Sequence, residues 1–128
     1  MTPDLQMLVW SAALALVQMV VAAIGAHGQV GLPALAGNRE DLPPITGWAG
    51  RVRRAHANML ENLVVFAILV LAAHVAGKAN ATTALGAALF FWGRLAYAIV
   101  YLAGVPWLRT AVWAVSLAGI LLIFTQLF

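Results

Sequence analysis

Four long runs of apolar positions, separated by short stretches with polar, glycine and proline residues, organise the chain. A transmembrane helix needs about 20 mostly apolar residues, and each run is long enough. The runs cover about residues 5–26, 51–76, 81–103 and 106–128. This pattern predicts an all-α integral membrane protein, with a single domain over residues 1–128 that forms a four-helix transmembrane bundle.

The composition agrees with that prediction and excludes several kinds of chemistry. The chain is 64% hydrophobic and 9% charged, with a mean hydropathy of +0.96, whereas soluble domains carry about 25% charged residues. It has no cysteine, so it can form no disulfide, protein thiolate or cysteine metal site. Its three histidines lack ligand-like spacing, so we expect no metal site. Its few basic residues cluster near the membrane, which argues against nucleic-acid binding.

The connections between the last three runs are short. "AGKANATT" occupies residues 76–83 and "LAGVPW" residues 102–107. Gly104 suits the C-cap of one helix, and Pro106 suits the first position of the next. We therefore expect the second, third and fourth helices to be antiparallel neighbours.

Basic residues predict the orientation in the membrane. The first connection, about residues 28–50, contains or borders several arginines, and the third contains another, whereas the opposite side carries only Lys78. The arginines are Arg39, Arg51, Arg53, Arg54 and Arg109. The positive-inside rule then places loops one and three in the cytoplasm and both termini outside. The high alanine content suggests a bacterial inner membrane.

The first connection is the only long one, and it contains Pro33, Pro43, Pro44 and five glycines. This composition predicts a non-helical segment. Long structureless loops tend to be functional or disordered. The segment is therefore interpreted either as a flexible linker or as a lid over a site on the cytoplasmic side.

Polar residues continue into two of the predicted spans. In "RRAHANMLEN" (residues 53–62) and the residue pair before it, a spacing of three, four and three places polar side chains on one helical stripe: Arg51, Arg54, Asn58 and Glu61. Arg94 is predicted about 15 Å deep in the third span, and such residues normally face a bundle interior and pair. Glu61 is the only acidic residue within a predicted span, so we expect a Glu61–Arg94 pair.

The alternative to a purely architectural pair is a positively charged cavity. Arg54, Arg94 and Arg109 lie at successive depths against Glu61 alone. Arg109 and Thr110 belong to the first turn of the fourth helix, where free N–H groups and the helix dipole favour an anion. A bound thiol there would be shifted toward its nucleophilic thiolate. These residues indicate a small anionic ligand, with any thiol supplied by the ligand itself.

Two stretches resemble a known family. "RAHANMLEN" (54–62) resembles the signature at the start of helix two in the membrane-associated proteins in eicosanoid and glutathione metabolism. "RLAYAIVY" (94–101), with Pro106, Arg109 and Thr110 after it, resembles a second stretch of that family. The agreement extends over essentially the whole chain. The chain differs from the family pattern at two positions. Ala57 stands where some members have an arginine, and Tyr97 stands where some members have a histidine.

The resemblance implies a homotrimer with glutathione bound between neighbouring subunits near the cytoplasmic side. It implies that glutathione is the co-substrate and that Arg109, Thr110 and Tyr101 are catalytic residues near its thiolate. By position, it also implies a set of glutathione contacts. The implied contacts are Arg54, His56, Asn58, Glu61, Arg94, Tyr101 and Arg109.

The leading hypothesis is a glutathione-dependent membrane transferase or peroxidase that acts on hydrophobic electrophiles drawn from the bilayer. The sequence does not separate the two reactions, because both need the same thiolate. One alternative is a non-catalytic scaffold that binds lipid or protein through the same cavity. Another is a small transporter in which Glu61 couples to protons, but that leaves Arg94, Tyr101 and Arg109 without a role.

Overall fold

The computed structural model describes all residues, 1–128, and every regular element in it is helical. The elements are α1 (Pro3–Val30), α2 (Leu32–Ala36), α3 (Gly47–Val75), α4 (Ala81–Ala103) and α5 (Pro106–Thr125). All except α2 are long and apolar enough to cross a membrane. The all-α class and the four membrane-length helices predicted from the apolar runs are confirmed.

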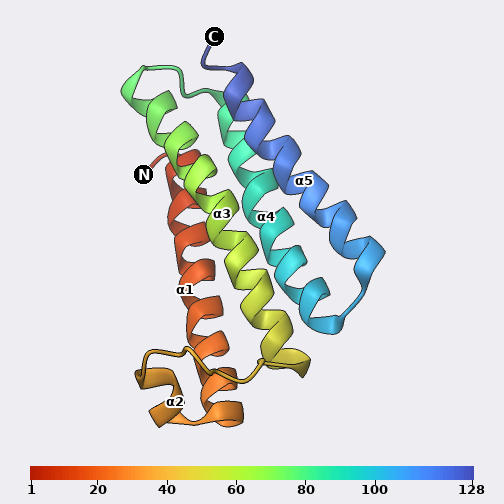
Figure 1. Ribbon diagram of the computed structural model, residues 1–128. Helices are drawn as coiled ribbons and strands as arrows, with labels where there is room; N and C mark the ends of the chain where they lie inside the picture. Colours follow the sequence, from red (N-terminus) through yellow and green to blue (C-terminus); the bar gives the residue numbers. More distant parts are fainter.

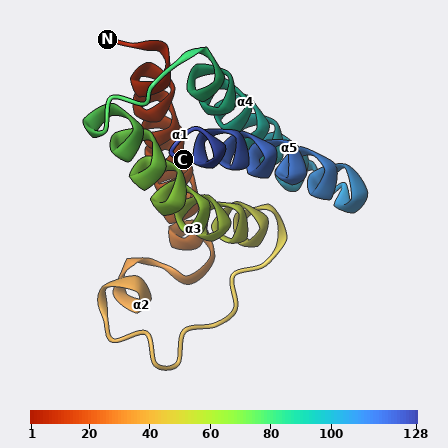
Figure 2. The same ribbon diagram turned by 90° about the horizontal axis from the view of Figure 1, so that it is seen from above.

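The four long helices run side by side along one axis, and both chain termini lie at the same end (Figure 1). We call this the termini end, and the opposite end, with α2 and the arginines, the arginine end. The most extensive contacts are those between α4 and α5 and between α1 and α3, while α1 and α5 are not packed together. Viewed along the bundle, α5 lies beside α4, on the side of α4 that faces α3 (Figure 2).

Glycines allow α4 and α5 to approach closely. A Cβ atom at Gly86 would lie 2.6 Å from the Gly119 carbonyl oxygen, and one at Gly93 would lie 3.0 Å from the Ser116 backbone nitrogen. Small residues of this kind are how membrane helices pack without a hydrophobic driving force. Gly104 ends α4 in the left-handed conformation, with φ 80°, and Pro106 begins α5, as the sequence predicts for this turn.

The interior is apolar and lies between α1, α3, α4 and α5. Phe66 of α3 stacks on Phe90 of α4 with ring centroids 3.9 Å apart, and both are fully buried. Around them are buried Ala15, Met59, Val70, Ala87, Ile120 and Ile123. Many large apolar side chains remain exposed on the outside, as expected of a surface that faces lipid or other subunits.

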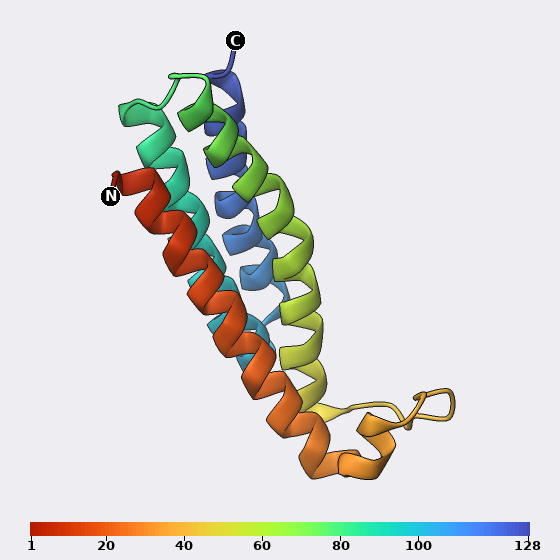
Figure 3. The ribbon, with the colours of Figure 1, turned by 90° about the vertical axis from the view of Figure 1, so that its left-hand side faces the viewer.

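The first connection corrects one expectation. The segment predicted to be non-helical contains α2, whose second residue is Pro33. Proline disrupts helix interiors but is well tolerated in the first turn, where its missing N–H has no partner to lose. This connection extends sideways from the bundle at the arginine end (Figure 3). The structured helices also begin earlier, at Pro3 and Gly47, than the apolar runs alone indicated.

Candidate functional site

Three helices bring two arginines to one tyrosine at the arginine end. Tyr101 lies in the last turn of α4, and its hydroxyl accepts a hydrogen bond of 3.1 Å from Nε of Arg54 on α3. The guanidinium carbon of Arg109, in the first turn of α5, lies 4.6 Å from the centroid of the Tyr101 ring. A tyrosine ring attracts cations through its negative face. The Tyr101 side chain therefore contacts two guanidinium groups, one from α3 and one from α5.

Deeper in the bundle, Arg94 continues this arrangement. Its guanidinium carbon lies 4.2 Å from the centroid of the Tyr97 ring, and Tyr97 contacts Tyr101 edge to face at 5.5 Å. Arg94 is only 1% exposed, yet its three side-chain nitrogens have no hydrogen-bond partner in the protomer. A buried charge without hydrogen bonds is strongly unfavourable. Arg94 is therefore a buried cation that lacks its counterpart.

The predicted Glu61–Arg94 pair is wrong for the protomer. The only ion pair in the structure joins Asp4 and His74 at the termini end, and Glu61 is exposed. Seven residues after Arg54, Glu61 lies on the same stripe of α3, but it makes no ion pair or hydrogen bond with Arg94. The sequence shows that both residues belong to membrane spans, but it does not show whether the two side chains meet within one protomer.

The remaining predicted residues are distributed around this cluster. The Asn58 side-chain oxygen accepts from Nδ2 of Asn62 at 3.2 Å, so the amide is engaged along α3 itself. Thr110 is exposed, and its hydroxyl donates to the Pro106 carbonyl at 3.4 Å. No side chain caps the first turn of α5. The positive end of that helix therefore remains open beside Arg109.

His56 lies elsewhere. It lines a small cavity of about 190 Å³ between α1, α2 and α3, together with Arg39 and Arg53. The structure thus groups Arg54, Tyr101, Arg109 and Arg94 through the two tyrosines, and neither His56 nor Glu61 makes an ion pair or hydrogen bond with that group within one protomer. We call Arg54, Arg94, Tyr97, Tyr101 and Arg109 the arginine–tyrosine cluster.

The spacing of three residues places Tyr97, or the neighbouring Ala98, on the helix face of Arg94, and the structure shows that it is the Tyr97 ring that contacts Arg94. One feature was missed from the sequence. Arg51 was expected only as part of the polar stripe, but its Nε donates to the Leu102 carbonyl at 3.0 Å and joins α3 to the end of α4. No sequence signal specifies that backbone acceptor.

Four membrane-length helices enclosing an unpaired buried cation define an integral membrane protein with a polar site between its helices. A family model described as the MAPEG family matches residues 7–128. The chain therefore belongs to the MAPEG family, and it is a membrane protein of the glutathione and eicosanoid metabolism kind. No curated protein and no solved structure matches it significantly.

Proposed function

We propose that the protein is a glutathione-dependent membrane transferase or peroxidase whose co-substrate binds at the arginine–tyrosine cluster. The observation that carries this proposal is Arg94, a guanidinium that is 1% exposed and has no hydrogen-bond partner. With Arg54 and Arg109 around Tyr101, it provides three cations for an anionic molecule. Glutathione has two carboxylates, an amine and a thiol, and family membership makes it the relevant anion.

The roles follow from the charges. Arg94 and Arg54 are suited to the two carboxylates, since guanidinium–carboxylate hydrogen bonds are strong and directional. Arg109, the uncapped start of α5 and the Tyr101 hydroxyl are suited to the sulfur, which they stabilise as the thiolate. Thr110 would add a hydroxyl at the same helix end, and Asn58 and Glu61 would add an amide and an anion for the ligand's polar atoms.

The thiolate then acts as the nucleophile toward a hydrophobic substrate that arrives from the bilayer. In conjugation, a carbon–sulfur bond forms, and the leaving group departs or the added electron pair is protonated. In peroxide reduction, the sulfur attacks one peroxide oxygen and the O–O bond breaks, which yields an alcohol and a sulfenic acid. A second glutathione converts the sulfenic acid to a disulfide and water. Both reactions use the same activated sulfur.

We further propose that the working unit is a homotrimer. Within one protomer Arg94 lacks an acceptor, and Glu61 lies on the exposed face of α3. An adjacent copy packed on that face would bring Glu61 to the glutathione bound between the two subunits, where its carboxylate would hold the amine of the ligand. The excess of arginines at one end favours a cytoplasmic position for the cluster, in the inner membrane of a bacterium.

Calorimetric titration of glutathione into the detergent-purified protein tests this proposal. We expect saturable binding that is lost in Arg94→Ala and in Arg109→Ala but kept in Lys78→Ala, which removes a cation at the termini end. The ultraviolet absorbance of the thiolate should appear on binding. Binding without that absorbance would favour the non-catalytic scaffold, and no binding by a folded oligomer would overturn the glutathione assignment.

A further inference from the structure

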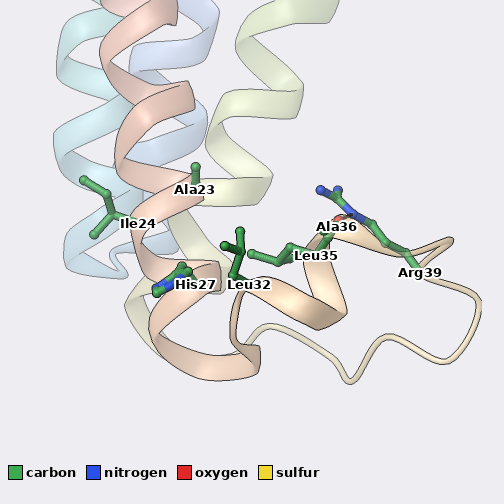
Figure 4. A pocket seen from close by; sticks show the side chains of 7 residues that line it. All are labelled: Ala23, Ile24, His27, Leu32, Leu35, Ala36 and Arg39. Atoms are coloured by element: carbon green, nitrogen blue, oxygen red, sulfur yellow. Dashed lines mark hydrogen bonds between the residues drawn. The ribbon is translucent and has the colours of Figure 1, made fainter.

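A second cavity lies at the arginine end, away from the arginine–tyrosine cluster. It has a volume of about 550 Å³ and is lined by the last turns of α1 and by α2 with the residues after it. Figure 4 shows Leu32 and Leu35 of α2 pointing toward α1, and Arg39 folded back beside Ala36. Ala23 and Ile24 of α1 form the opposite wall. We call this cavity the α1–α2 groove.

The groove is open because α2 is attached to the bundle on one side only. Gly31, with φ 81°, reverses the chain after α1, and α2 packs against no long helix except α1. Leu32 is 61% exposed despite facing the groove. The leucines of α2 therefore present apolar surface that the protomer itself does not cover.

Cations border the groove on the side toward α3. The smaller cavity that contains His56 shares Ala23, Leu35 and Arg39 with the groove and adds Arg53. The Arg39 side chain is held in place because its Nε donates to the Leu35 carbonyl at 2.8 Å. Neither arginine forms an ion pair, although Glu40 and Asp41 follow Arg39 directly. The linings of the two cavities include no acidic residue.

The depth of the groove matches the boundary of a membrane. At 1.5 Å per residue, α1 is about 42 Å long, whereas the hydrocarbon core is about 30 Å thick. If α1 is centred in the membrane, the core ends about ten residues beyond the midpoint of the helix, close to Ala26. Ala23 and Ile24 then lie just inside hydrocarbon, while Arg39 and Arg53 line the adjoining cavity together with Ala26, near the boundary of the core.

We propose that the α1–α2 groove is a binding site for one anionic phospholipid of the adjoining leaflet. Its acyl chain lies on Ala23, Ile24, Leu32 and Leu35, and its phosphate lies between Arg39 and Arg53. A free anion would leave the apolar walls uncovered, and a lipid without net charge would leave two cations only partly neutralised. The bound lipid joins α2 to α1 and so fixes the first connection against the bundle. This site is separate from the proposed glutathione site.

Native mass spectrometry of the detergent-purified full chain tests the site, with phosphatidylglycerol and phosphatidylcholine of identical acyl chains as probes. We expect one tightly retained phosphatidylglycerol per chain and much weaker retention of phosphatidylcholine. The Arg39→Gln/Arg53→Gln variant should bind phosphatidylglycerol about 10- to 30-fold more weakly, since each basic residue near a headgroup contributes a several-fold effect. Arg53→Gln alone should give part of that loss; it removes a cation that makes no hydrogen bond in the protomer.

The matched control is Arg51→Gln/Lys78→Gln, which removes the same charge outside the groove and should retain the lipid. Equal losses in both double variants would mean diffuse surface attraction and would overturn the site, as would equal retention of the two lipids.

Ala23→Phe fills the groove without changing charge and should abolish retention. A different result would be that the unmodified chain retains no lipid and Ala23→Phe lowers the oligomeric mass. In that case a second copy covers the groove, and the lipid proposal is wrong. Free glycerol 3-phosphate should not compete, and effective competition would show that the acyl chain is not recognised.

Discussion

The two ends of the bundle treat their buried polar groups in opposite ways. At the termini end, Asp4 is 3% exposed; its carboxylate pairs with Nε2 of His74 at 2.9 Å and accepts from the Thr83 hydroxyl at 3.2 Å. Thr83 and Asn80 cap α4 reciprocally, and Asn80 donates to Gln126 at 2.8 Å. At the arginine end, Arg94 is as deeply buried as Asp4 but has no acceptor.

This difference separates architecture from function. A buried polar group whose partners all come from its own chain joins helices, as Asp4 does for α1, α3 and α4. A buried charge without such partners needs a hydrogen-bonding or oppositely charged group from a ligand or another subunit. The comparison therefore predicts that substitutions at the termini end reduce stability, whereas substitutions in the arginine–tyrosine cluster reduce ligand binding and turnover.

The largest effect is expected for Arg109→Ala. Removing a preorganised positive group from a developing or bound anion typically lowers turnover by about 100-fold or more. Arg109 is only half-buried and contacts the Tyr101 ring, so the fold should remain. Glutathione conjugation by the purified variant, together with its oligomeric mass, measures both. Unchanged turnover would exclude the proposed role of Arg109.

The next effect concerns stability at the other end. Asp4→Ala removes one of the two acceptors near the Thr83 hydroxyl and leaves His74 without its ion pair, so the free energy of unfolding should fall by about 2–4 kcal/mol. Glutathione affinity should not change. Denaturant titration of the detergent-solubilised protein measures the loss, and Asp4→Asn, which keeps an oxygen for Thr83, should lose less. Equal stability of Asp4→Ala and the unmodified chain would contradict the architectural role.

Arg94 gives the sharpest test of the comparison, because the two ends predict opposite results for equally buried residues. Arg94→Met removes an unpaired charge and keeps an apolar side chain against Tyr97. The ligand-free protein should therefore keep its free energy of unfolding within about 1 kcal/mol or become more stable, while glutathione affinity falls about tenfold or more. Parallel denaturant and calorimetric titrations measure the two quantities. Strong destabilisation without ligand would show that Arg94 has a partner in the assembled protein.

These contrasts also show how far the sequence could lead. The apolar runs predicted the four membrane-length helices, because length and hydropathy constrain a membrane span strongly. The sequence also selected Arg54, Arg94, Tyr101 and Arg109, which the fold brings into one cluster. It did not predict that Glu61 and Arg94 form no ion pair within the protomer, since that depends on how α3 packs against α4. The partners of Asp4 are 70 and 79 residues away, and no local pattern indicates such pairs.

The smallest effect is expected for Tyr101→Phe, which separates the two contacts of this residue. The variant keeps the ring beside Arg109 but removes the hydroxyl that accepts from Arg54. A hydrogen bond to a charged group contributes about 1.5–3 kcal/mol at most; because Arg54 is exposed and water can replace the hydroxyl, we expect about threefold to tenfold weaker glutathione binding. Tyr97→Phe is the matched control, since its hydroxyl makes no hydrogen bond in the protomer while its ring remains under Arg94. A loss as large as that of Arg109→Ala would mean that the Tyr101 hydroxyl itself acts on the sulfur, and the catalytic role would then be shared between tyrosine and arginine.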